Sequence, residues 1–188
     1  MRIIAGQYRG RRIATVKDHS VRPATDRVRE TIFNVLVHRM DIQGTRVLDL
    51  FAGSGSLGLE ALSRGAAHAT FVEQSAAAIT YLERNIRALG CEAATELAAM
   101  DAISFLDAAR PAYDLIFADP PYRMERTAEI PDVVMAKGLL ARSGFLLIEH
   151  AADLRFVSNT RYQVGPEKKF GRTIVTFFRT PPQHEGRN

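Results

Sequence analysis

This sequence predicts a doubly wound α/β fold, with a mostly parallel sheet and an antiparallel last strand. Apolar strand-like runs alternate with amphipathic helical segments between residues 46 and 149. Connections of helical length favour parallel pairing, with helices on both faces of the sheet. The last two strand-like runs are joined by a segment too short for a helical crossover, so we expect them to pair antiparallel.

The chain begins with a predicted hairpin at Arg2–Ala14, because isoleucines supply β propensity and two glycines allow turns. A loop and then a helix follow, the helix capped by Thr25 or Asp26 and reaching about Met40. Arg29 is expected to lie off the buried stripe of this helix. Apolar residues at i, i+4, i+7 and i+8 define that stripe: Val28, Ile32, Val35 and Leu36.

From residue 46 onward, strands and helices alternate. Strands are expected at Arg46–Phe51, Ala69–Val72, residues 94–99, Tyr113–Ala118, Gly144–Glu149, Tyr162–Val164 and Thr173–Arg179. Helices are expected at Ser56–Arg64, Ser75–Leu89, Ala102–Ala109 and Thr127–Leu140. Gly65 and Gly90 end the first two of these helices, and Pro111 ends the third.

Three parts are predicted along the chain: a basic hairpin extension at 1–24, an α/β domain at 25–179 and a disordered tail at 180–188. A length of 188 residues suits one domain whose core needs neither a disulfide nor a metal. The tail is expected to be disordered because it lacks core-forming residues. The single cysteine, Cys91, has no neighbours at metal-ligand spacing, so we expect an incidental thiol.

Positive charge is concentrated at the start of the chain. Residues 1–46 carry a net charge of +6, whereas the whole chain carries +4. Such one-sided charge favours a polyanion partner, RNA or DNA, and its alternative is a solvated basic face without a partner. Few cysteines, no signal peptide and no membrane-spanning run predict a cytoplasmic protein without a membrane partner. We expect a monomer.

A glycine loop stands between the first strand of the domain and its helix. Gly53, Gly55 and Gly58 match G-x-G-x-x-G, in which glycines let the backbone approach a ligand. That pattern suits NAD or FAD as well as S-adenosylmethionine. Asp49, at the end of the strand, would repel a pyrophosphate but suits the ammonium of a methionine moiety. We therefore expect S-adenosylmethionine as cofactor and S-adenosylhomocysteine as product.

An acidic residue follows at the spacing that an adenosine cofactor requires. Glu73 ends the second strand, 20 residues after Gly53, where a carboxylate holds ribose hydroxyls. Gln74 would flank the adenine. Asp101 either contacts the adenine amino group or caps the next helix. The expected cofactor-binding residues are Asp49, Ala52, Gly53, Gly55, Glu73, Gln74, Asp101 and Ala102.

A rigid tetrapeptide, Asp119-Pro120-Pro121-Tyr122, directly follows the predicted strand Tyr113–Ala118. The Asp119 carboxylate and the Pro120 carbonyl are two fixed acceptors for an amino group, and Tyr122 offers a face on which a base can stack. An exocyclic amine is a poor nucleophile until hydrogen bonds turn its lone pair toward the methyl donor. We therefore expect Asp119, Pro120 and Tyr122 to be catalytic, without a metal, on a base that leaves its stack.

At this point the sequence resembles class I methyltransferases, which combine D-x-F-x-G-x-G, an acid after the second strand and [N/D/S]-P-P-[Y/F/W] after the fourth. The tetrapeptide alone does not choose among adenine-N6, cytosine-N4, guanine-N2 and glutamine-N5 methylation. Four stretches are similar to the RsmD family of 16S ribosomal RNA guanine-N2 methyltransferases: Arg2–Gly6, Arg22–Asn34, Phe51–Gly65 and Lys168–Thr173. The resemblance covers residues 1–179 and departs at Ala24, where threonine is common, and Phe170, where tyrosine is common.

The resemblance implies a Rossmann-like domain that methylates N2 of one guanine in 16S ribosomal RNA, within an assembled or partly assembled small subunit. It also implies that the hairpin lies over the cofactor side and guides RNA. Expected phosphate contacts, each otherwise an ordinary surface residue, are Arg9, Arg11, Arg12, Lys17, Arg22, Lys168 and Lys169. The alternatives are a DNA adenine-N6 methyltransferase, a non-catalytic RNA-binding ribosome-assembly factor and a nicotinamide dehydrogenase.

Overall fold

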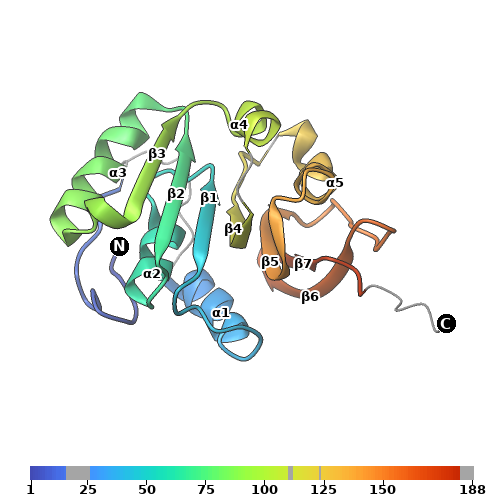
Figure 1. Cartoon of the computed structure of the whole chain (residues 1–188), viewed down its shortest axis with the longest axis horizontal. Coiled ribbons are helices and arrows are strands. Elements are labelled where there is room, and N and C mark those ends of the chain that lie inside the picture. Colours follow the sequence, from blue (N-terminus) through green and yellow to red (C-terminus); the bar gives the residue numbers. More distant parts are fainter. Residues whose placement is uncertain (16–25, 110–111, 123, 183–188) are drawn as a thin grey trace.

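The computed structural model describes residues 1–15, 26–109, 112–122 and 124–182 of the chain. Its centre is a seven-stranded sheet in the order β3-β2-β1-β4-β5-β7-β6, flanked by helices (Figure 1). The strands are β1 (Arg46–Leu50), β2 (His68–Glu73), β3 (Thr95–Ala99), β4 (Tyr113–Ala118), β5 (Leu140–Ala151), β6 (Gln163–Phe170) and β7 (Thr173–Arg179). The helices are α1 (Asp26–Leu36), α2 (Ser56–Ser63), α3 (Ala76–Leu89), α4 (Ala102–Ala108) and α5 (Ile130–Ala136), with 3₁₀ turns at Glu92–Ala94 and Glu125–Glu129.

The strand pairings confirm the predicted fold class. Strands β1 to β5 pair in parallel, and β7 pairs antiparallel with both β5 and β6. The chain moves outward from β1 to β2 and β3, then returns to β4 on the other side of β1. In an open parallel sheet, a crevice for ligands forms where the order reverses, at the carboxyl ends of the strands. Here that point lies between β1 and β4, and both predicted motifs follow these two strands.

Two apolar layers hold the sheet between its helices. On one face, alternate sheet residues such as Leu115 and Phe117 pack with α1, α2 and α3. On the other face, the intervening residues, such as Ile116, pack with α4 and α5. Because both faces are buried, the central strands are almost continuously apolar. Among the residues that the structure describes, no helix has the length and apolar character that a bilayer span requires.

Several predicted boundaries were wrong in the last third of the fold. The predicted helix Thr127–Leu140 is shorter, because the chain turns at Gly138, whose φ is +64°. Strand β5 begins earlier than predicted, since Leu140 already pairs with Tyr113. Strand β6 is eight residues long although three were predicted. It is an edge strand, and the exposed charged residues that protect such edges hide the apolar alternation of a strand.

The prediction that Arg29 lies off the buried face of its helix was wrong. Its side chain is fully buried. The guanidinium donates hydrogen bonds to the Arg2 carbonyl, to the Ser56 carbonyl at 3.4 Å and to the Asp26 carboxylate at 2.7 Å. Burial lowers the pKa of Arg29, while the nearby Glu60 and Asp26 carboxylates oppose that shift. The arginine thus joins three segments: the start of the chain, α1 and the start of α2.

The predicted hairpin forms as a loop that one antiparallel bridge, between Arg2 and Arg12, closes. It is anchored on α2 by Glu60, whose buried carboxylate accepts the backbone N–H groups of Ile4 at 2.8 Å and Ala5 at 3.0 Å. Buried isoleucines on both sides of the loop join the main core. The predicted boundary between residues 24 and 25 lies outside the described residues.

Replacing Gly6 with alanine is expected to detach this hairpin. A Cβ at Gly6 would lie 1.7 Å from the carbonyl oxygen of Ser63, and the φ of Gly6 is +81°. We expect the free energy of unfolding to fall by about 2–4 kcal/mol, measured by urea denaturation. Gly10→Ala is the matched control: Gly10 has a φ of +82°, but nothing lies within 4 Å of its Cβ position. The control should lose only about 1 kcal/mol, and equal losses for the two variants would contradict the anchoring.

Candidate functional site

The glycine loop leaves β1 with a left-handed backbone. Phe51, at φ 59°, is a non-glycine residue in this region, and Gly53 and Gly55 follow at φ 56° and 83°. A Cβ at Gly55 would lie 2.4 Å from the Leu82 side chain, so close packing requires glycine there. A Cβ at Gly53 would meet nothing within 4 Å. The loop is therefore packed against the protein at Gly55 and open at Gly53, which leaves room for a ligand against the backbone.

Asp49 lies beneath this loop with 2% of its surface exposed. Its Oδ2 accepts a hydrogen bond from the backbone N–H of Gly58 at 2.9 Å. Burial raises the pKa of Asp49 to about 7, which the Gly58 hydrogen bond opposes and the Glu73 charge increases. The carboxyl group therefore gains or loses its proton near neutral pH, and an ammonium group beside it would favour the ionised form.

Glu73 ends β2 and holds the loop from the other side. One carboxylate oxygen accepts the N–H of Gly53 at 2.8 Å, and the other accepts the N–H of Ser75 at 2.8 Å. It therefore links the glycine loop to the start of α3. Each oxygen keeps further lone-pair capacity for hydroxyl donors in the crevice. Gln74 is exposed immediately after it.

Asp101 follows β3 and caps α4. Its Oδ1 accepts the backbone N–H of Ser104 at 2.9 Å and the Ser104 hydroxyl at 3.1 Å. The backbone hydrogen bond from Ser104 is the largest cause of its lowered pKa. Ala102 is buried at the start of the helix. Of the two roles that the sequence left open for Asp101, the structure displays the helix cap, and the adenine contact stays a prediction.

The Asp-Pro-Pro-Tyr loop leaves β4 beside the glycine loop. Its turn is held by a hydrogen bond from the Met124 N–H to the Pro121 carbonyl at 2.8 Å. Burial raises the pKa of Asp119 well above its ordinary value, and the nearby charges of Glu149 and Asp49 raise it further. The Tyr122 side chain is 62% exposed, an unusual position for a large aromatic residue. The loop therefore joins a half-buried carboxyl group to an uncovered aromatic ring.

Glu149 is a candidate site residue that the sequence analysis missed. Ala118 pairs with Ile148, so the next residues, Asp119 and Glu149, lie beside each other at the carboxyl edge. Glu149 is the last residue of the predicted strand Gly144–Glu149, and this position at the carboxyl end of a parallel strand could have indicated a site residue. Within the described residues, no group of three His, Cys, Asp or Glu side chains could hold a metal ion.

Asn85 of α3 is the second missed residue, buried to 2% exposure. Its Nδ2 donates to the carbonyls of Ser54 and Ala14, both at 2.9 Å, and its Oδ1 accepts the Ala14 N–H at 2.8 Å. One side chain thus joins the N-terminal hairpin to the glycine loop. In the sequence, Asn85 lies on the apolar face of the predicted helix Ser75–Leu89, and this polar residue among apolar ones was the only local indication of its role.

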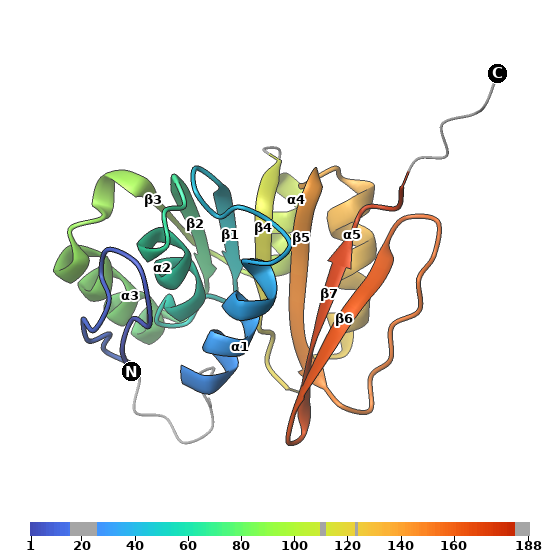
Figure 2. The same cartoon turned by 90° about the horizontal axis from the view of Figure 1, so that it is seen from below.

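The predicted RNA contacts divide into two groups on opposite flanks of the sheet (Figure 2). On the hairpin, Arg9 and Arg12 are exposed, whereas the Arg11 guanidinium donates to the carbonyls of Ala88 and Leu89 at the end of α3. On β6, Lys168 and Lys169 are exposed near a turn at the carboxyl edge, where Thr173 pairs with Ala151. Lys17 and Arg22 lie outside the described residues. Contact with RNA stays a prediction for every one of them.

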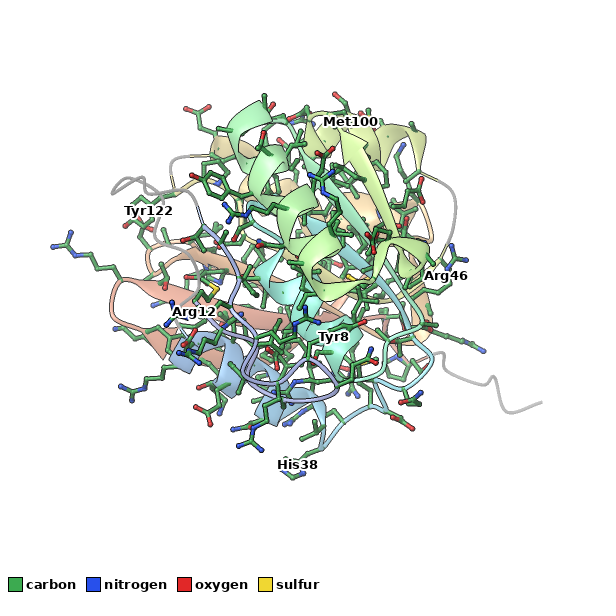
Figure 3. All side chains as sticks on the ribbon, turned by 90° about the vertical axis from the view of Figure 1, so that its left-hand side faces the viewer. Tyr8, Arg12, His38, Arg46, Met100 and Tyr122 are labelled. Carbon is green, nitrogen blue, oxygen red and sulfur yellow. The ribbon has the colours of Figure 1, made fainter. Side chains whose placement is uncertain are left out.

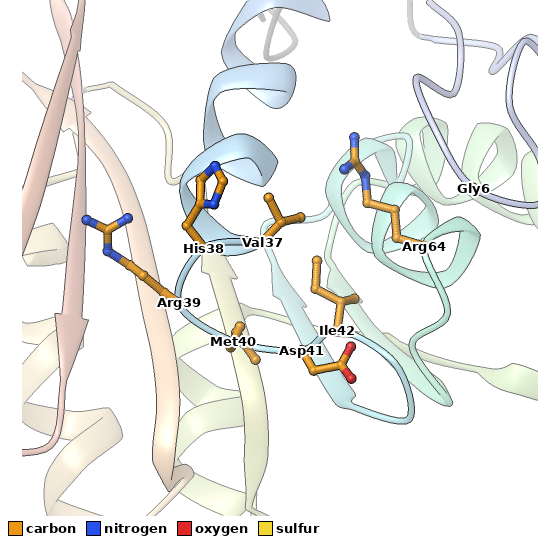
Figure 4. A pocket seen from close by; sticks show the side chains of 8 residues that line it. All are labelled: Gly6, Val37, His38, Arg39, Met40, Asp41, Ile42 and Arg64. Atoms are coloured by element: carbon orange, nitrogen blue, oxygen red, sulfur yellow. The ribbon is translucent and has the colours of Figure 1, made fainter.

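A hollow of about 590 Å³ lies apart from this site. It is formed by the connection from α1 to β1 together with Gly6 and Arg64, at the opposite edge of the sheet (Figure 4). Arg64 is held there by Glu60 at 2.8 Å and by stacking over Phe33, with its guanidinium carbon 4.5 Å from the ring centre. Neither motif contributes a residue to this hollow.

A glycine loop after β1 and an acid-Pro-Pro-Tyr loop after β4, at the ends of two neighbouring parallel strands, define a Rossmann-like methyltransferase. The chain belongs to the family described as conserved hypothetical protein 95, the RsmD family, whose model matches residues 1–179. Ribosomal RNA small subunit methyltransferase D of Escherichia coli is 40% identical over 81% of this chain and 76% of its own length. Its counterpart from Haemophilus influenzae is 33% identical over 94% of this chain and 91% of its own. The solved structure of yhhF from Escherichia coli has a TM-score of 0.83 and 35% identity, over 97% of this chain and 99% of that one.

Proposed function

We propose that this protein transfers a methyl group from S-adenosylmethionine to the N2 amine of one guanine in 16S ribosomal RNA of the small subunit. The observation that carries the proposal is the Asp119–Tyr122 loop beside the glycine loop at the point where the strand order reverses. Relatives named ribosomal RNA small subunit methyltransferase D support the choice of RNA.

The residues of the crevice fit S-adenosylmethionine, which supplies the methyl group when it is bound. Glu73 would accept the ribose hydroxyls, Asp49 would balance the ammonium, directly or through water, and Gly53 would leave space for the cofactor. Gln74, Asp101 and Ala102 would border the adenine. SMU.776, a protein of the same fold with a TM-score of 0.67 and 16% identity, over 86% of this chain and 50% of that one, was solved in complex with SAH.

The tetrapeptide would prepare the amine for transfer. The Asp119 carboxylate and the Pro120 carbonyl would accept its two N–H bonds, while the base stacks on Tyr122. These acceptors would direct the nitrogen lone pair away from the ring. After transfer the amine carries an extra proton, and a carboxylate whose pKa is raised takes up a proton more readily than an ordinary one. The chain thus supplies orientation and a proton acceptor.

The second carboxyl group supports guanine over adenine. Guanine carries N1–H beside its N2 amine, so its edge presents neighbouring donors, whereas adenine has an unprotonated N1 beside its N6 amine. Asp119 and Glu149 lie beside each other and offer neighbouring acceptors. We therefore propose that Asp119 receives the amine and that Glu149 receives N1–H.

Replacing Glu149 with glutamine is expected to weaken this discrimination. In 2-aminopurine, the N2 amine is present but N1 lacks its hydrogen, so the Glu149 carboxylate should reject it. A glutamine amide can donate to that N1 or accept from guanine. The ratio of kcat/KM for guanine over 2-aminopurine, placed at the mapped target position in reconstituted subunits, should fall at least about tenfold. An unchanged ratio, with guanine still methylated, would contradict the role of Glu149.

Binding of S-adenosylhomocysteine is expected to depend on pH through Asp49. With a pKa of about 7, this carboxyl group is protonated below neutral pH and then no longer attracts an ammonium. Affinity measured by calorimetry should therefore fall as the pH decreases from about 7 to about 5, by up to about tenfold per unit. Asp49→Asn, which cannot ionise, should bind weakly with a much flatter profile. If the affinity of the wild-type protein depended on pH as little as that of the variant, Asp49 would not be the group that binds the ammonium.

The direct test supplies purified protein with labelled S-adenosylmethionine and unmodified small subunits. We expect the label in N2-methylguanine after digestion of the 16S RNA. Naked 16S RNA and duplex DNA serve as parallel substrates. Label in N6-methyladenine, or transfer to DNA in preference to the subunits, would contradict the proposal and favour the adenine-N6 alternative.

A further inference from the structure

A second hollow, of about 530 Å³, lies between the N-terminal hairpin and α3. It stands outside the crevice that holds the two motifs. Three arginines line it, Arg2 and Arg12 from the hairpin and Arg84 from α3. Its lining also includes Ile13, Ala14 and Asn85, of which Ile13 and Asn85 are buried. The hairpin and α3 thus place three arginines around one concavity.

The described residues around this hollow do not balance its charge. Among the residues that the structure describes, its lining contains no acidic residue. Neither Arg12 nor Arg84 forms an ion pair or a side-chain hydrogen bond with another described residue, and Arg2 makes only a 3.4 Å hydrogen bond to the Gly10 carbonyl. The neighbouring acids are engaged elsewhere: Glu83 with Arg87 at 3.8 Å, and Asp26 with Arg29 at 2.7 Å. Unbalanced like charges around a concavity favour an anionic ligand.

Asn85 connects the hollow to the cofactor side. It lines the hollow, and its amide also holds the Ser54 carbonyl of the glycine loop at 2.9 Å. An anion in the hollow would therefore lie one buried side chain away from that loop. Arg12 and the exposed Tyr122 are found toward the same edge of the molecule in Figure 3. A strand that enters at Arg12 could thus extend toward the tetrapeptide.

We propose that this hollow binds a backbone phosphate of the RNA substrate near the target nucleotide, with Arg12 and Arg84 as its principal contacts and Arg2 beside them. The inference rests on the proposed function and adds α3 to the RNA-binding surface. Guanidinium groups suit this role, because they present several N–H donors to phosphate oxygens. Such contacts position the RNA without reading its sequence. The hollow therefore fixes the strand while the base enters the crevice.

The test uses the Arg12→Gln/Arg84→Gln double variant of the full chain and unmodified small subunits. Loss of the contact with this one phosphate should reduce the slope of log affinity against log salt by about 0.7–0.9. At fixed salt, KM for subunits should rise at least about tenfold, with kcat at saturation and affinity for S-adenosylhomocysteine retained. Arg87→Gln is the matched control, because Arg87 is exposed on the same helix but paired with Glu83, and it should behave as wild type.

A second variant separates charge from structure. Arg12→Lys/Arg84→Lys keeps both charges and should keep most of the salt dependence. A double glutamine variant with wild-type slope and KM would overturn the phosphate site, as would an equal effect of Arg87→Gln. Failure of the proposed function would look different: the wild-type protein itself would then not methylate guanine in the subunits.

Discussion

Replacing Asp119 with alanine is expected to lower kcat for methyl transfer by about 10²–10³-fold. The change removes one of the two proposed acceptors for the amine, and with it the proposed proton acceptor beside Glu149. It should leave affinity for S-adenosylhomocysteine close to that of the wild type, because the glycine loop and Glu73 are unchanged. Single-turnover methylation of small subunits and calorimetry with S-adenosylhomocysteine measure the two quantities separately.

Two comparisons refine this result. Asp119→Asn keeps an acceptor oxygen but cannot take up a proton, so its kcat should fall between those of the wild type and the alanine variant. Asp107→Asn is the surface control, because Asp107 is largely exposed and only pairs with Lys137 at 3.2 Å. A wild-type kcat in Asp119→Ala would show that this residue is not catalytic.

Replacing Glu73 with alanine should have the largest effect on cofactor binding. The change leaves the N–H groups of Gly53 and Ser75 without their acceptor and removes the expected ribose contact. A loss of about 3 kcal/mol corresponds to an increase of about 10²-fold in Kd for S-adenosylhomocysteine, measured by calorimetry. At saturating cofactor, kcat should recover substantially, which distinguishes this variant from Asp119→Ala.

The control for that variant is Glu83→Ala, on the exposed side of α3. Glu83 is half exposed and pairs with Arg87 at 3.8 Å, so its loss should leave Kd unchanged. Equal affinities for Glu73→Ala and the wild type would show that the carboxylate shapes the loop without contacting the cofactor. A circular dichroism melt of each variant checks that the fold is retained.

The central strands and both motif loops could be predicted because their signals are local. Tyr113–Ala118 forms β4 with the predicted bounds, since a short apolar run between polar segments is typical of a buried strand. Gly90 ends α3 at φ 69°, as a glycine after the last apolar residue of a helix indicates. In such segments, residues close in sequence determine the structure.

The rest depends on partners that are far apart in the sequence. Arg29 is buried because Arg2 and Ser56 supply carbonyls, each 27 residues away. Asn85 is satisfied by Ala14, 71 residues earlier, and Glu149 acquires its place only when β5 pairs with β4. Helical or strand periodicity contains no information about these contacts. For the same reason, the sequence identified basic residues on the hairpin but could not place Arg84 beside them.

The central claim, guanine-N2 methylation of 16S ribosomal RNA by this site, is tested most directly in cells. Mass spectrometry of digested 16S RNA would compare cells with the gene, cells without it, and deletion cells that carry either the wild-type or the Asp119→Ala protein. We predict that one N2-methylguanine disappears on deletion, returns with the wild-type protein and stays absent with Asp119→Ala. Full restoration by Asp119→Ala, or loss of a methyladenine in place of the guanine, would contradict the claim.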